Sequence, residues 1–62
     1  MNKRSNESIR HEARFLARAW HRLNYPQASQ EDATLYADSE WRRYVHLVGL
    51  PRKELTALLK PQ

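Results

Sequence analysis

The sequence predicts an all-α fold, a small three-helix bundle, from three observations. One glycine and three prolines fall between the periodic segments rather than inside them. Apolar residues recur three and four positions apart, the period of an amphipathic helix, and no segment shows the strict alternation of a strand. The chain has 62 residues and no cysteine, so its stability depends on well-packed helices or on a partner rather than on disulfides. We therefore expect residues 1–62 to form a single helical domain.

The first helix is expected over residues 6–23, after a polar stretch, residues 1–5, that should be frayed. Ser5 or Asn6 can cap this helix, and Glu7 lies in the first turn, where the helix dipole favours a carboxylate. Pro26 ends the segment, because proline disfavours helical geometry in the residue before it. The apolar face of this helix is expected to consist of Ile9, Ala13, Leu16, Trp20 and Leu23.

The second helix is expected over residues 30–48. Ser29 is a suitable N-cap, and Asp32 lies where a capping-box carboxylate belongs. The helical spacing then continues through Ala33, Ala37, Trp41, Tyr44, Val45 and Val48. A separate helix could instead begin at Glu40, but no glycine or proline interrupts the pattern, and we therefore favour one helix.

A short third helix is expected over residues 51–60, after a turn formed by Gly49, Leu50 and Pro51. Its apolar residues are Leu55, Leu58 and Leu59. The first two helices have similar lengths and a short connection, so they should pack antiparallel. The third helix should then fold back over this pair.

Charge is distributed in three blocks, although the net charge is only +4. Residues 1–23 carry six basic and two acidic side chains, and residues 41–62 carry five basic and one acidic. Residues 24–40 carry four acidic side chains and none that is basic. Two basic surfaces separated by an acidic segment indicate an anionic partner.

The sequence gives little indication of catalysis. The segment HEARF begins like a zinc-protease motif, but Phe15 stands where the second histidine would bind the metal. We expect no metal site and no cofactor, because His11 and His21 are too far apart to share an ion and the single glycine excludes a phosphate-binding loop. We expect no enzymatic activity. No apolar run is long enough for a membrane span, and no secretory signal begins the chain, so we expect a cytoplasmic protein without a membrane partner.

The first candidate surface is a band of arginines on the first helix, opposite its apolar face. These residues recur every fourth position, a like-charge spacing that weakens an isolated helix slightly. An exposed face without function usually mixes acidic and basic residues at that spacing, so the repeat favours binding over mere solubility. The band consists of Arg10, Arg14, Arg18 and Arg22.

The second candidate surface is a helix-turn-helix over residues 41–60. The turn glycine of that template is Gly49, and its apolar positions are occupied by Tyr44, Val48, Leu50, Leu55 and Leu58. One position differs from the template, which takes a small residue where this chain has Val45. The polar residues expected to meet DNA from the last helix are Arg52, Lys53, Thr56 and Lys60, and Arg42 and Arg43 add charge near the turn.

Together these surfaces predict a small nucleic-acid-binding regulator, with duplex DNA favoured, which would bind as a homodimer if the helix-turn-helix is real. The alternative is an adaptor or inhibitor that docks its helical surface on a larger acidic protein, because arginine binds carboxylates as well as phosphates. Phe15 and Leu47 lie at the margins of their apolar faces, where residues usually complete the edge of a core. An exposed Phe15 beside Arg18 would be typical of a protein interface instead.

Overall fold

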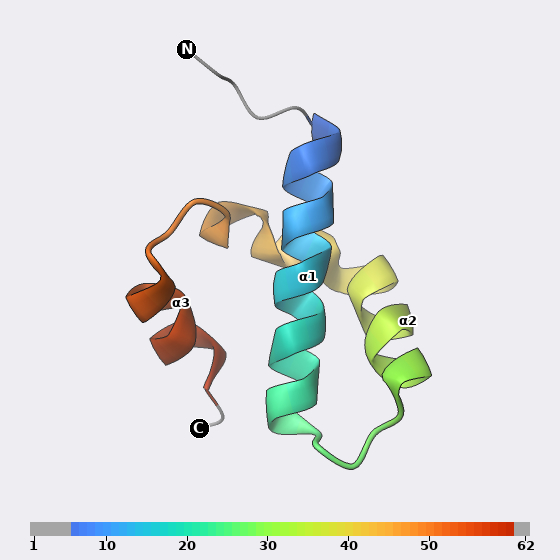
Figure 1. Cartoon of the computed structure of the whole chain (residues 1–62). Helices are drawn as coiled ribbons and strands as arrows, with labels where there is room; N and C mark the ends of the chain where they lie inside the picture. Colours follow the sequence, from blue (N-terminus) through green and yellow to red (C-terminus); the bar gives the residue numbers. More distant parts are fainter. Residues whose placement is uncertain (1–5, 61–62) are drawn as a thin grey trace.

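The computed structural model describes residues 6–60, which contain helices and connecting turns and no strand. Helix α1 spans Asn6–Asn24, and α2 spans Gln30–Glu40. A 3-10 helix, η1, covers Trp41–Leu47, and α3 spans Arg52–Leu59. Helices α1 and α2 are antiparallel (Figure 1). The predicted all-α architecture with three helices is confirmed.

Helix α1 is the central element, and the rest of the described chain wraps around it (Figure 1). In that view α2 lies on one side of α1, η1 crosses behind it, and α3 lies on the other side. The shortest dimension of the molecule is 14 Å. Two packed helices have about this thickness at the level of their Cα atoms, since helix axes lie roughly 8–10 Å apart. Among residues 6–60, no element covers the side of α1 that faces the viewer in Figure 1.

Local signals fix the end of α1 and the start of α2 close to where the sequence predicts them. The Tyr25 backbone N–H donates to the His21 carbonyl at 2.8 Å and closes the last turn of α1. The Ser29 hydroxyl accepts the Asp32 backbone N–H at 3.0 Å, which satisfies a donor that the helix itself leaves free. The side-chain amide of Asn24 donates to the Leu59 carbonyl at 3.4 Å and so joins the end of α1 to the end of α3.

The segment predicted as one helix over residues 30–48 changes type at Glu40, where φ is −114° and ψ is 7°. The α-helix ends there and the chain continues as η1. A 3-10 helix has three residues per turn, so Trp41, Tyr44 and Leu47 lie on one face of η1. Tyr44 is buried, and the other two pack against the core.

Gly49 forms the predicted turn before α3. Its φ of +94° lies in a region that favours glycine, because other residues carry a Cβ that crowds the backbone there. The Leu50 backbone N–H donates to the Leu47 carbonyl at 3.2 Å across this turn. Helix α3 then begins after Pro51, whose carbonyl accepts the Leu55 backbone N–H at 3.0 Å.

The core is built mainly from alanine. Ala13 and Ala17 of α1, with Ala33 and Ala37 of α2, are each at most 1% exposed. We call these four residues the alanine seam. Side chains this small allow two helix backbones to approach closely, because helix separation depends on the side chains at the contact. The larger buried side chains are Leu16, Tyr44 and Leu59.

The core face of α1 keeps the predicted Ala13, Leu16 and Trp20 but is shifted toward Ala17. Ala17 lies in the core, although the sequence did not single it out, and the predicted core residue Leu23 is 49% exposed. On α3 the buried leucine is Leu59, while Leu58 is 53% exposed. The predictions for Leu23 and Leu58 are therefore wrong.

An aromatic cluster extends the core at the contact between α1 and α2. The Trp20 ring stacks on Tyr36 with centroids 5.4 Å apart, and the Tyr36 and Tyr44 hydroxyls share a hydrogen bond of 2.7 Å. Burial, together with this hydrogen bond, raises the pKa of Tyr44 well above its ordinary value. His21 packs against Tyr25 and Tyr36, and its Nδ1 is buried without a hydrogen-bond partner in the described part of the chain.

Candidate functional site

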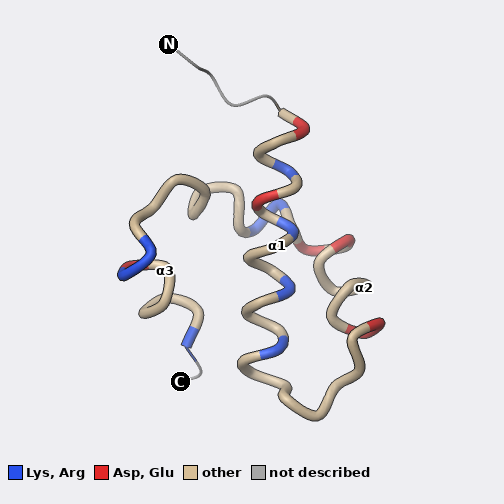
Figure 2. The backbone as a smooth tube through the Cα atoms, in the orientation of Figure 1, with Lys and Arg blue, Asp and Glu red and all other residues tan. Residues whose placement is uncertain are grey.

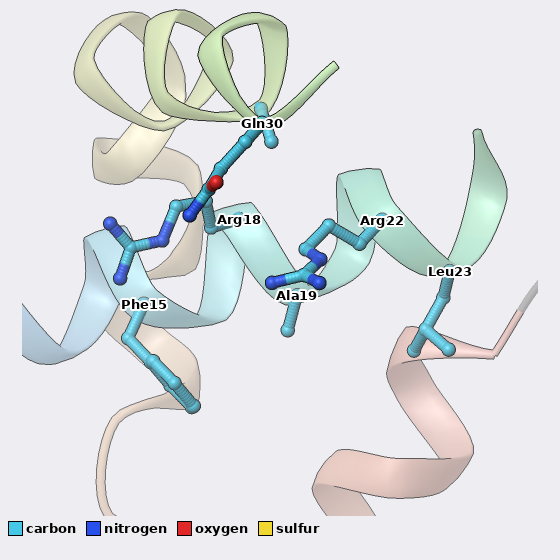
Figure 3. A pocket seen from close by; sticks show the side chains of 7 residues that line it. Phe15, Arg18, Ala19, Arg22, Leu23 and Gln30 are labelled. Carbon is cyan, nitrogen blue, oxygen red and sulfur yellow. The ribbon is translucent and has the colours of Figure 1, made fainter. Parts of the chain in front are cut away.

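The uncovered side of α1 forms one wall and the floor of an open groove of about 490 Å³. Helix α2 contributes two residues from its first turn, and the remaining lining residues belong to α1 (Figure 3). The lining combines apolar and basic side chains: Phe15, Arg18, Ala19, Arg22, Leu23, Gln30 and Ala33.

Three residues of α1 form an apolar row along the groove. Phe15, Ala19 and Leu23 are four positions apart, so the row follows one face of the helix for about 12 Å. Phe15 is 57% exposed and Leu23 is 49% exposed. Ala19 leaves a hollow between these two large side chains. Phe15 thus does not complete a core edge as expected, whereas Leu47 does pack against the core.

Two arginines of the predicted band run beside this apolar row. Arg18 and Arg22 are one turn apart on α1, and in Figure 3 the Arg22 side chain reaches back along α1 to the level of Ala19. In the same view the side-chain amide of Gln30 points toward Arg18. Within residues 6–60, neither arginine forms an ion pair with a carboxylate. Both guanidinium groups therefore keep their donors available to an anionic ligand.

Arg14 belongs to the predicted band by spacing but differs in its surroundings. Its guanidinium forms an ion pair and a hydrogen bond with the Asp38 carboxylate on α2. Both side chains are close to half exposed, at 40% and 47%. The acidic segment therefore neutralises one member of the band, and the band is not a continuous surface of free charge.

The antiparallel register explains why this pairing stops after one turn. Four residues further along α1 and four residues back along α2 from that ion pair stand Arg18 and Thr34. Another such step brings Arg22 to the level of Gln30. Helix α2 thus has a carboxylate at the level of the first of three successive arginines, and the uncharged residues Thr34 and Gln30 at the levels of the other two.

Three further predicted arginines lie at or near η1, away from the groove. The Arg42 guanidinium lies 5.1 Å from the centre of the Trp41 ring, within the range of a cation–π interaction. Arg43 pairs with Glu40 at 3.1 Å. Arg10, near the start of α1, lines a small hollow together with Trp41.

The remaining predicted residues lie on or next to α3. All four are exposed, and the Thr56 hydroxyl donates to the Arg52 carbonyl at 2.9 Å, within the helix itself. Lys53 follows Arg52 in the first turn, and Lys60 follows the last residue of the helix. Figure 2 shows basic positions along α1 and at both ends of α3, with the acidic positions of α2 beside α1. The ten predicted residues are therefore divided among α1, η1 and α3 rather than joined in one site.

The geometry of residues 41–60 departs from a helix-turn-helix in two respects. The turn glycine is present, but the first helix is a 3-10 helix of seven residues. On the second helix the interior leucine of the template, Leu58, faces solvent while Leu59 is buried.

Among the described residues, the groove is the feature on which a functional assignment can be based. The described residues contain no group of three or more histidine, cysteine or acidic side chains arranged to hold a metal ion. No helix between residues 6 and 60 has both the length and the apolar character needed to cross a bilayer. Comparisons with protein-family models, curated proteins and solved structures find no match.

Proposed function

We propose that this chain is a protein-binding module, an adaptor or inhibitor, that docks on a larger acidic partner through the groove of α1. The observation that carries the proposal is the exposed pair Phe15 and Leu23 beside Arg18 and Arg22, which form no ion pair within residues 6–60. Aromatic residues and arginine are enriched at protein interfaces, where an apolar anchor supplies most of the binding energy. The planar guanidinium adds orientation, because it binds a carboxylate through two parallel hydrogen bonds.

A protein partner accounts for this face better than a phosphate backbone does. A duplex backbone would make no use of the Phe15 and Leu23 side chains, since phosphate contacts are polar. The mixture of apolar and basic residues therefore favours a folded or folding polypeptide.

The test is capture of partners from cell lysate before and after nuclease treatment, with the tagged chain as bait. The groove variant carries Phe15→Ser and Leu23→Ser, and the control carries Leu35→Ser. Leu35 is a suitable control because it is 60% exposed on α2 and lies outside the groove. We expect a nuclease-resistant partner that the control retains and the groove variant loses. Equal capture by both variants, or capture that nuclease abolishes, would contradict a protein-docking groove.

The second candidate is a nucleic-acid-binding regulator that uses α3 rather than α1. Its specific support is the pair Arg52 and Lys53, both exposed at the start of α3 directly after the Gly49 turn. Binding to duplex DNA should then weaken steeply as salt rises, because each neutralised phosphate releases counterions. Charge reversal of Arg52 and Lys53 should flatten that dependence, whereas reversal of Arg18 and Arg22 should leave it unchanged. No binding at low salt would exclude this candidate.

A further inference from the structure

The apolar row of the groove has the geometry of a site for a helix. Its three residues extend over about 12 Å, a distance that apolar side chains at positions i, i+4 and i+7 of a partner helix can follow. The hollow above Ala19, between the exposed Phe15 and Leu23, can receive one such side chain. Only one edge of the groove is apolar, so the partner helix needs an apolar stripe and not an apolar surface all round.

The basic edge defines the charge of the same helix. Arg18 and Arg22 are one turn apart, so their Cβ atoms are about 5–6 Å apart, and carboxylates at i and i+4 of a helix have the same spacing. The protein already contains one contact of this kind, since Arg14 of α1 meets Asp38 of the antiparallel α2. At the next two turns α2 provides Thr34 and Gln30, and the carboxylates are missing.

From these two observations we propose that the occupant of the groove is an acidic amphipathic helix of the partner protein. This inference rests on the proposed function and specifies its ligand. The helix carries apolar residues along one stripe and two carboxylates one turn apart beside that stripe, which pair with Arg18 and Arg22. A second copy of this chain is a poorer occupant, because a symmetric contact through the same face would bring the arginines of both copies together.

A titration with synthetic peptides followed by NMR tests the proposal directly. The probe is a stapled helical peptide of about four turns, with leucines at i, i+4 and i+7 and glutamates at the two flanking positions. We expect its addition to shift the backbone amide signals of Phe15, Ala19 and Leu23. A matched peptide with both glutamates replaced by glutamine should bind about tenfold more weakly, and one with lysines should not bind.

Two variants of the chain separate insertion into the hollow from general apolar attraction. Ala19→Leu adds apolar surface but fills the hollow, so we expect at least a tenfold loss of peptide affinity. Ala57→Leu on the exposed side of α3 is the matched control and should bind as the wild type does. In the charge-swapped pair, Arg18→Glu should restore binding of the lysine peptide. Thermal unfolding of each variant confirms that it is folded at the temperature of the titration.

The outcomes distinguish a wrong ligand from a wrong function. If no glutamate peptide shifts the groove signals at millimolar concentration, the acidic helix is refuted, while loss of the captured partner in the Phe15→Ser and Leu23→Ser variant would still support docking. Equal affinity for the glutamate and glutamine peptides, or tighter binding by Ala19→Leu, also refutes the acidic helix. If the same signals shift with the concentration of the protein in the absence of peptide, a second copy of the chain is the occupant. If the peptide binds but the Phe15→Ser and Leu23→Ser variant captures the partner as well as the wild type does, only the proposed function is refuted.

Discussion

Replacing Ala17 with leucine should destabilise this protein strongly, because that position is fully buried between α1 and the rest of the core. Ala17 is 0% exposed and lies in the alanine seam opposite α2, whose own contributions are Ala33 and Ala37. Leucine adds three carbon atoms at a fully buried position of the core. The helices must separate or the new side chain must take an unfavourable rotamer, and either change typically costs about 1–3 kcal/mol.

This cost is a large fraction of the total stability. At about 0.05–0.15 kcal/mol per residue, a chain of 62 residues has a free energy of unfolding of roughly 3–9 kcal/mol. A loss of about 2 kcal/mol lowers Tm by roughly 8–16 °C in a domain of this size. Urea unfolding followed by circular dichroism should show a lower midpoint with an unchanged slope, because the surface exposed on unfolding stays nearly the same.

The control is Ala57→Leu, which makes the same chemical change at an exposed position of α3. Substitutions at such positions usually change stability by less than about 0.5 kcal/mol. If Ala17→Leu and Ala57→Leu unfold at the same temperature, α1 and α2 are not in close contact through alanine, and the orientation assigned to α1 is wrong.

Three further predictions concern single contacts. Gly49→Ala should cost about 1–2 kcal/mol from backbone strain alone, because φ is +94° and the added Cβ would meet no described atom within 4 Å; an unchanged urea midpoint would contradict it. The folded state holds the Tyr44 phenol proton more tightly than the unfolded chain does, because folding raises the Tyr44 pKa. Its contribution to stability is therefore complete below about pH 10 and decreases as the pH rises further. The free energy of unfolding should decrease less steeply with alkaline pH in Tyr44→Phe than in the wild type, and an equal decrease would refute the assignment. A double-mutant cycle on Arg14→Ala and Asp38→Ala should give a coupling of about 0.2–1 kcal/mol that diminishes with salt, since both side chains are near half exposed; a coupling of zero at low salt would show that the pair does not form in solution.

The start of α2 and the turn before α3 could be predicted because short-range chemistry determines them. The Ser29 hydroxyl satisfies a backbone donor three residues away, and Gly49 adopts a φ that other residues resist. Neither effect depends on the rest of the fold. The change of helix type after Glu40 is more difficult to foresee, since Trp41, Tyr44 and Leu47 lie on nearly one face in either kind of helix.

The shift of the core face of α1 could not be predicted from apolar character alone. Leucine is more hydrophobic than alanine, so Leu23 was assigned to the core and Ala17 was not. The structure selects for size instead, because Ala33 and Ala37 of α2 allow an approach that a leucine would block. The available signal was a pair of alanines four residues apart in each helix, and its meaning depends on pairing two distant segments.

For the same reason, the site could be predicted only in part. Arg18 and Arg22 follow from the repeat within one helix, and an exposed Phe15 was recognised as a mark of a protein interface. Ala19 and Gln30 were missed, because their presence in the groove depends on how α1 and α2 align. Local sequence thus identified the charges, and the helix register determined which of them remain unpaired.

The alanine seam and the groove both result from the way in which the described chain packs around α1. Only three side chains larger than alanine are buried in the described part of the chain, so burial alone gives this fold little reserve. A ligand that binds only the folded state raises stability, by about 2.7 kcal/mol when its concentration is a hundred times Kd. The glutamate peptide should therefore raise the Tm of the wild type by roughly 10–20 °C at that concentration, and it should have no such effect on Arg18→Glu. Peptide binding without any rise in Tm would show that the groove is not a property of the folded state, and the link between the uncovered face of α1 and its function would fail.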